Sequence, residues 1–104
     1  MVKEGDLWVI PLYGARYAFR EWTWGEKNAL LTECSRLTPQ GTYDLDSTKF
    51  NEGLVLKTAF KEVDGKFVPF EVNELRNMRG KLVDYIFQIT QKLNLVSQSE
   101  TANL

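Results

Sequence analysis

Few side chains of this sequence are of a type that performs chemistry. It contains one cysteine, Cys34, and no histidine. Nucleophilic mechanisms that pair Ser or Cys with His are therefore excluded, as are zinc sites built from histidines or from four cysteines. Cys34 lies on the apolar face of an expected helix, without a flanking cation to lower its pKa, so we interpret it as a core residue. A lone cysteine cannot form an internal disulfide, which favours a reducing compartment.

Acidic residues provide the remaining catalytic option, because a pair of carboxylates can act as acid and base. Nothing in the sequence marks such a pair on opposite sides of a cleft. The spacing of Asp44 and Asp46 resembles the start of a calcium loop, but its sixth and twelfth positions hold Lys49 and Val55 in place of Gly and Glu. The glycines are scattered and form no phosphate-binding loop. We expect no metal, no cofactor and no enzymatic activity.

The charge pattern argues against nucleic acid and membrane partners. The formal net charge is −1, and the nearest approach to a basic patch is Arg76, Arg79 and Lys81, which have acidic neighbours. We interpret this group as a solvated helix face, since nucleic-acid-binding domains usually carry a strong basic excess. No apolar run approaches the roughly 18 residues of a membrane span. Residues 1–6 are polar, unlike a signal peptide, so we expect a cytoplasmic protein.

The first half of the chain predicts a β-hairpin followed by a helix. Residues 7–13 are apolar and β-branched, and residues 16–22 alternate between apolar and polar. Pro11 lacks a backbone N–H, so the first strand should lie at an edge or end near it. The sequence from Thr23 to Glu26 has the T-x-x-E pattern of a capping box, which predicts a helix from Trp24 to Leu37. Residues 38–41 should end it.

The second half contains one segment that the sequence leaves open. Residues 47–62 fit either a helix beginning at Ser47 or an alternating strand, and Gly53 weakens the helical interpretation by roughly 1 kcal/mol. Asp64 and Gly65 predict a type I′ turn within a hairpin at about residues 57–70. Residues 71–94 predict a helix, which Gly80 could divide in two. Its apolar stripe recurs at steps of three and four: Leu75, Met78, Leu82, Ile86, Ile89 and Leu93.

Together these elements predict a small α+β fold. We expect one domain over residues 1–104, in which antiparallel β-hairpins pack against two or three helices. Residues 1–6 and 97–104 are polar and are expected to be flexible.

The apolar residues left over from this core are the expected protein-binding residues. Val83 and Phe87 lie about 100° around the last helix from its main stripe, and widen the apolar face beyond what one packing partner needs. The alternative is that both pack under the 57–70 hairpin. Trp22 and Trp24 are further candidates, because exposed aromatic residues dominate protein interfaces. A stacking surface for bases or sugars is less favoured than packing of the tryptophans onto the first helix.

Several segments resemble a viral family. Residues 19–28 hold a strand end followed by T-W-G-E-x-N at a helix start, and residues 50–56, 73–75, 80–85 and 93–94 also fit. Over roughly residues 16–100 the chain resembles the tail assembly chaperone-like small tail proteins of tailed phages. The resemblance implies a viral or prophage protein that binds the tape-measure protein in the host cytoplasm and helps tube subunits assemble around it. It implies no active site.

Three functions remain open at this point. The first is an assembly chaperone with tape-measure or tail tube proteins as partners, and it allows a homo-oligomer. The second is a structural virion component, such as a tail completion or neck protein. The third is a small nucleic-acid-binding module that uses the aromatic hairpins and the basic group.

Overall fold

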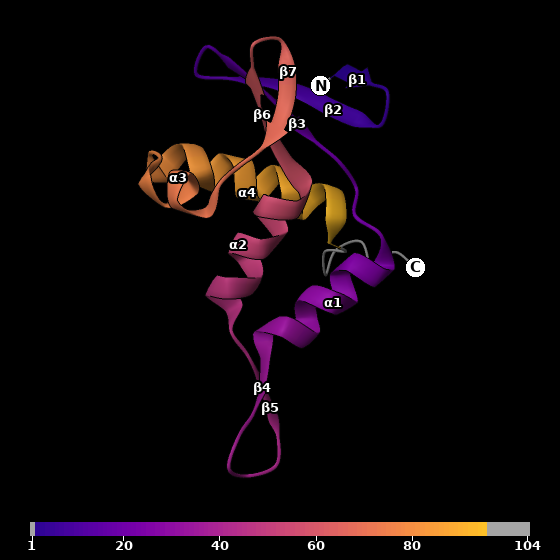
Figure 1. Ribbon diagram of the computed structural model, residues 1–104, viewed down its shortest axis with the longest axis vertical. Helices are drawn as coiled ribbons and strands as arrows, with labels where there is room; N and C mark the ends of the chain where they lie inside the picture. The colour runs from indigo at the N-terminus through magenta and orange to yellow at the C-terminus, as the bar shows by residue number, and fades with distance from the viewer. Residues whose placement is uncertain (1, 96–104) are drawn as a thin grey trace.

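A five-stranded antiparallel sheet forms one end of the molecule. The computed structural model of the protein describes residues 2–95. The strands follow the order β1-β2-β3-β6-β7, so β3 and β6 meet across a long connection that contains two helices (Figure 1). Their bounds are β1 (Val2–Glu4), β2 (Leu7–Leu12), β3 (Ala15–Phe19), β6 (Ala59–Val63) and β7 (Lys66–Pro69).

Four helices and a second, two-stranded sheet complete the described part of the chain. The helices are α1 (Trp24–Cys34), α2 (Ser47–Thr58), α3 (Val72–Asn77) and α4 (Gly80–Asn94), and the small sheet pairs β4 (Ser35–Leu37) with β5 (Tyr43–Leu45). The expected α+β class is confirmed. The β4–β5 hairpin extends away from the body at the end opposite the large sheet (Figure 1).

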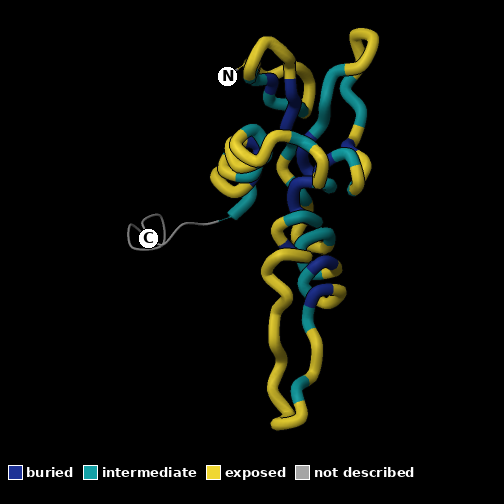
Figure 2. The backbone as a smooth tube through the Cα atoms, turned by 90° about the vertical axis from the view of Figure 1, so that its left-hand side faces the viewer, coloured by how far each residue is buried: buried dark blue, intermediate teal, exposed yellow. Residues whose placement is uncertain are grey.

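The larger core lies between one face of the sheet and α4. Cross-strand pairing places Trp8 beside Phe19, and Phe19 beside Ala59. Ile86 of α4 packs into the same cluster, and like Phe19 and Ala59 it is fully buried. The expected stripe of α4 therefore faces the core. Burial is concentrated where the sheet meets the helices, whereas the β4–β5 hairpin is almost entirely exposed (Figure 2).

The smaller core lies between α1 and α2, which approach closely at Gly53. It contains Leu30, Cys34 and Phe50, with Trp22 packed against it. A Cβ atom added at Gly53 would lie 2.6 Å from Cδ1 of Leu30, closer than carbon atoms can pack. Glycine therefore lets the two helices cross here without displacing the buried Leu30 side chain, although it costs helix propensity.

Asn94 connects the end of α4 to the segment between β3 and α1. Its side-chain amide donates to the carbonyl oxygens of Arg20 and Thr90, each at 3.1 Å, and the N–H of Trp22 donates to its Oδ1 at 2.8 Å. One side chain thus satisfies backbone groups about 70 residues away in the sequence, and it joins the two cores.

Several local predictions are confirmed. Thr23 caps α1 with a complete capping box, in which its Oγ1 accepts from the N–H of Glu26 at 3.1 Å. Asp64 and Gly65 both have positive φ angles, as a type I′ turn requires. The predicted helix over residues 71–94 is interrupted after Asn77, and α4 begins at Gly80. Pro11 lies in the half of β2 that β1 does not reach, and there β2 is an edge strand.

Helix α1 ends three residues earlier than predicted. Ser35 adopts an extended backbone, and its Oγ donates to the carbonyl oxygen of Leu31 at 2.6 Å. The N–H of Asp46 donates to the carbonyl oxygen of Cys34 at 2.9 Å. The carbonyls of Leu31 and Cys34 are therefore satisfied without another helical turn. As a consequence Leu37, predicted on the helix, belongs to β4.

The remaining differences concern the open segment and the N-terminus. Residues 47–58 form a helix, with Asp46 as N-cap, and only from Ala59 does the chain become a strand. The expected hairpin is present but begins two residues later than predicted. Residues 1–6 were predicted to be flexible, yet Val2–Glu4 pairs with β2 as β1. Residues 97–104 lie outside the described residues.

Candidate functional site

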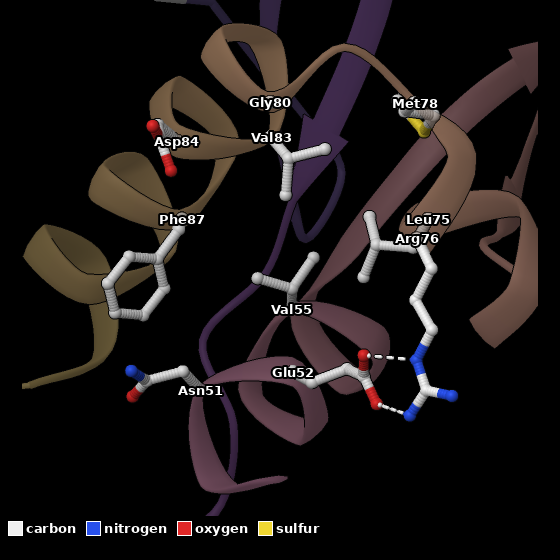
Figure 3. A pocket seen from close by; sticks show the side chains of 10 residues that line it. All are labelled: Asn51, Glu52, Val55, Leu75, Arg76, Met78, Gly80, Val83, Asp84 and Phe87. Carbon is white, nitrogen blue, oxygen red and sulfur yellow. Dashed lines mark hydrogen bonds and ion pairs between the residues drawn. The ribbon is translucent and has the colours of Figure 1, made fainter. Parts of the chain in front are cut away.

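Val83 and Phe87 lie on a different side of α4 from the residues that face the sheet. Both are half-buried and pack against the edge of the larger core. They face α2 and α3 across a groove, rather than the β6–β7 hairpin that the alternative interpretation named as their cover. Figure 3 shows the Val83 side chain directed toward Val55 of α2, whereas the Phe87 ring extends toward Asn51.

The groove between α2, α3 and α4 has a volume of about 440 Å³ and opens to solvent. Its apolar lining comes from all three helices and the turn between the last two (Figure 3). These apolar residues are Val55, Leu75, Met78, Val83 and Phe87. Val55 and Leu75 are buried beneath it, while Phe87 stands at its wall. The groove therefore offers an apolar surface that the described residues leave partly uncovered.

An ion pair between Glu52 and Arg76 closes one end of the groove. Nε of Arg76 lies 2.8 Å from Oε2 of Glu52, and Nη2 lies 2.7 Å from Oε1, so the contact is bidentate. Hydrogen bonding to Arg76 lowers the pKa of Glu52 below its usual range, and the same contact raises the pKa of Arg76. The pair links α3 to α2 at this end of the groove.

Asp84 and Asn51 form the polar rim on the other side. Asp84 is exposed, and within residues 2–95 no cation lies within ion-pair distance of its carboxylate. Asn51 is likewise exposed, and its side chain lies near the Phe87 ring (Figure 3). The polar groups of the groove thus lie at its rim, and its interior is apolar. This distribution suits an apolar side chain inserted from above, with a basic or hydrogen-bonding neighbour at the mouth.

The two tryptophans named as binding residues lie away from this groove. Trp22 is half-buried and meets Phe50 edge-on, with ring centroids 6.0 Å apart. It therefore supports the smaller core, as the packing interpretation predicted. Trp24, at the start of α1, is 78% exposed, so the packing predicted for the tryptophans is wrong for this residue. It also lines no part of the groove. The structure brings together only Val83 and Phe87 of the four candidates.

The side chains that could have taken part in catalysis or metal binding have structural roles instead. Cys34 is buried, and burial raises the pKa of its thiol, which disfavours the reactive thiolate. Asp46 of the Asp-x-Asp spacing accepts from the N–H of Lys49 at 3.1 Å as the cap of α2. Among residues 2–95 no group of three or more His, Cys, Asp or Glu side chains could hold a metal ion. In the same residues no helix is long and apolar enough to cross a bilayer.

An exposed apolar ribbon was not predicted from the sequence. Leu37, Tyr43 and Leu45 are 63%, 75% and 45% exposed, and all belong to the β4–β5 hairpin. The sequence feature that could have predicted this ribbon is the alternation of Tyr43 and Leu45 around Asp44. It was obscured because Leu37 also fits the helical spacing of α1.

Comparisons with protein-family models, curated proteins and solved structures found no match to this chain.

Proposed function

We propose that this chain is a non-enzymatic assembly protein of a tailed phage or prophage. It acts by binding another protein, the tape-measure protein, in the cytoplasm of the host cell. The proposal joins the sequence resemblance described above to one structural observation, the apolar groove between α2, α3 and α4.

The groove supports protein binding because of where its polar groups lie. Small-molecule sites of similar volume direct a few polar groups inward to orient the ligand. Here Glu52 and Arg76 bind each other, and the interior holds only apolar side chains. An apolar groove with a polar rim matches the core-and-rim pattern of protein interfaces. An amphipathic helix, which places apolar residues at every third or fourth position, is the ligand that fits it best.

The structure and the sequence also disfavour a nucleic-acid-binding module and an enzyme. Arg76, one of the three basic residues of the expected nucleic-acid patch, is engaged by Glu52. The sequence has no histidine and its one cysteine is buried, so a Ser–His or Cys–His pair is excluded. These features support a binding role without chemistry.

Capture by co-expression tests the proposal. The chain is expressed with the affinity-tagged tape-measure protein of the phage or prophage that encodes it, and the retained protein is quantified. We expect the wild-type chain to be retained. We expect Asp84→Arg to lose retention, because it places a cation where a basic rim contact is predicted and leaves the core untouched. Lys66→Glu, an exposed charge reversal in β7 at the far end of the sheet, is the matched control.

Two outcomes would contradict the proposal. In the first, wild-type chain is not retained although it is folded by circular dichroism. In the second, Asp84→Arg is retained as well as Lys66→Glu. Analysis of purified particles separates the chaperone from a structural virion component, since only the latter remains in the mature particle.

A further inference from the structure

The β4–β5 hairpin carries an apolar face that no other described element covers. Its register places Leu37 opposite Tyr43 and Arg36 opposite Asp44. Because side chains alternate along a strand, Leu37, Tyr43 and Leu45 share one face of the ribbon, and the two charged residues share the other. The hairpin stands apart from the body in both views (Figures 1 and 2).

Hydrogen bonds within the hairpin show which backbone groups face outward. The N–H of Thr38 donates to the carbonyl oxygen of Thr42 at 2.7 Å, and the N–H of Asp46 donates to that of Cys34 at 2.9 Å. Hydrogen-bonded and non-hydrogen-bonded pairs alternate in antiparallel ladders, so Arg36 and Asp44 face each other across the hairpin. The N–H and C=O groups of Leu37 and Tyr43 therefore point away from it, on opposite edges.

Both edges are consequently open, although each strand is only three residues long and carries one charged residue, features that limit non-specific pairing. Edge strands are commonly blocked by proline, by bulges or by a covering element. β4 and β5 contain no proline, and their register is continuous. A two-stranded hairpin is also marginally stable alone and gains from a third strand or a packed face. The open edges and the apolar face thus both favour a protein ligand.

Charge complementarity favours pairing with a second copy of this chain in one arrangement. Two β5 edges paired about Asp44 would bring like carboxylates together, and two β4 edges paired about Arg36 would bring like guanidinium groups together. Like charges directly opposite are destabilising. A register about Tyr43 or Leu37 instead sets each charge opposite an uncharged threonine, Thr42 or Thr38, so no symmetric pairing places opposite charges together. The β4 edge of one copy beside the β5 edge of the next instead places Arg36 opposite Asp44, and Leu37 opposite Tyr43. This register equals the one within the hairpin, so neighbouring copies are not offset along the strands.

We infer that the hairpins of successive copies join edge to edge, β4 to β5, into a continuous antiparallel sheet. The contact is heterologous, which closes into a ring when the rotation between copies permits it. The apolar residues of every copy would then lie on one face of this sheet as a continuous belt. This surface is separate from the groove of the proposed function, and neither inference depends on the other.

Charge reversal tests the inference on the full-length protein. Sedimentation velocity and light scattering should find the wild-type chain as an assembly larger than a dimer. Asp44→Arg and Arg36→Asp should each reduce it to the monomer, because each leaves like charges facing across the contact. The combined swap, Arg36→Asp with Asp44→Arg, should restore the assembly. Tagged wild-type chain should capture untagged wild-type chain but not the swapped chain.

The melting temperature of each variant is measured alongside, to show that the body of the fold is unchanged. A wild-type chain that is monomeric at its highest soluble concentration would overturn the inference. So would an assembly that stops at a dimer, one that survives both single reversals, or a swap that fails to restore it.

Discussion

At the scale of single residues, Thr23 shows how much structure a short local pattern can determine. Its hydroxyl and the Glu26 carboxylate satisfy each other's backbone N–H groups, at 3.1 and 2.9 Å. Only three residues separate the partners, so no tertiary information is needed to predict the contact. The same holds for the turn at Asp64 and Gly65, whose dipeptide alone specifies its backbone conformation.

Replacing Thr23 with Ala should lower the free energy of unfolding by about 1 kcal/mol, the usual cost of losing an N-cap. The N–H of Glu26 would lose its acceptor, while no buried side chain would change. Urea denaturation of the wild-type and variant proteins measures the difference. Thr32→Ala, which alters an exposed threonine in the last turn of the same helix, should have a smaller effect. Equal effects would contradict the capping role.

Glu26 should also give the protein a measurable sensitivity to acid. Hydrogen bonds from Arg20, at 3.0 and 2.6 Å, and from the N–H of Thr23 lower its pKa from the usual 4.5 to about 2. A lowered pKa in the folded state stabilises the protein above the unfolded value, and this contribution is lost as the pH falls from about 4.5 toward 2. Glu26→Gln removes the carboxylate that takes up a proton in this pH range. The stability difference between wild type and Glu26→Gln should therefore be greatest at neutral pH and shrink across that window. Parallel pH curves would contradict this assignment.

At the scale of elements, prediction succeeded where one periodicity dominated and failed where two competed. The stripe of α4 repeats over four turns, so it identified both the helix and its buried face. In residues 47–62 a helix passes directly into a strand, and the alternation of the strand extends backward into the helix. Gly53 favoured a strand over the helix that forms. Its presence reflects tertiary packing and not local propensity, because the buried side chain of Leu30 occupies the space of a Cβ.

Gly53→Ala provides the test of that close approach. Helix propensity alone would make alanine better by about 1 kcal/mol. Contact with Leu30 should reverse the sign and destabilise the protein by about 1–3 kcal/mol, the usual cost of overpacking. In a Leu30→Ala background the same change should become neutral or stabilising, which a double-mutant cycle of unfolding free energies would reveal. A stabilising Gly53→Ala in the wild-type background would refute the contact.

Only one wall of the groove between α2, α3 and α4 could be predicted from the sequence, for a related reason. Val83 and Phe87 could be recognised because they fall outside the stripe of their own helix. The opposite wall comes from Val55 and Leu75, on helices whose placement depends on the whole fold. The β4–β5 ribbon was missed because strands of three residues carry too little periodicity to be distinguished from a loop or a helix end.

At the scale of the whole molecule, Asn94 holds together parts that are distant in the sequence. Asn94→Ala would leave the N–H of Trp22 and the carbonyl of Arg20 without their partner. We expect it to lower the free energy of unfolding by about 1–3 kcal/mol, the cost of unsatisfied, partly buried groups. Asn77→Ala is the matched control, since Asn77 bonds only within its own helix and is exposed. Equal losses in thermal denaturation would show that the long-range link is unimportant.

The central claim is that the groove of α2, α3 and α4 is a protein-binding surface, and Phe87→Ala tests it most directly. Both its melting temperature and its retention by the tagged tape-measure protein are measured. Tyr85→Ala is the control, because Tyr85 lies on the same helix but contacts Tyr13, at 6.2 Å between ring centroids, instead of lining the groove. We predict that Phe87→Ala loses retention yet stays folded, with a stability loss well below the about 3–5 kcal/mol of a fully buried phenylalanine, while Tyr85→Ala keeps retention. An unfolded Phe87→Ala protein, or one retained as well as Tyr85→Ala, would contradict the claim.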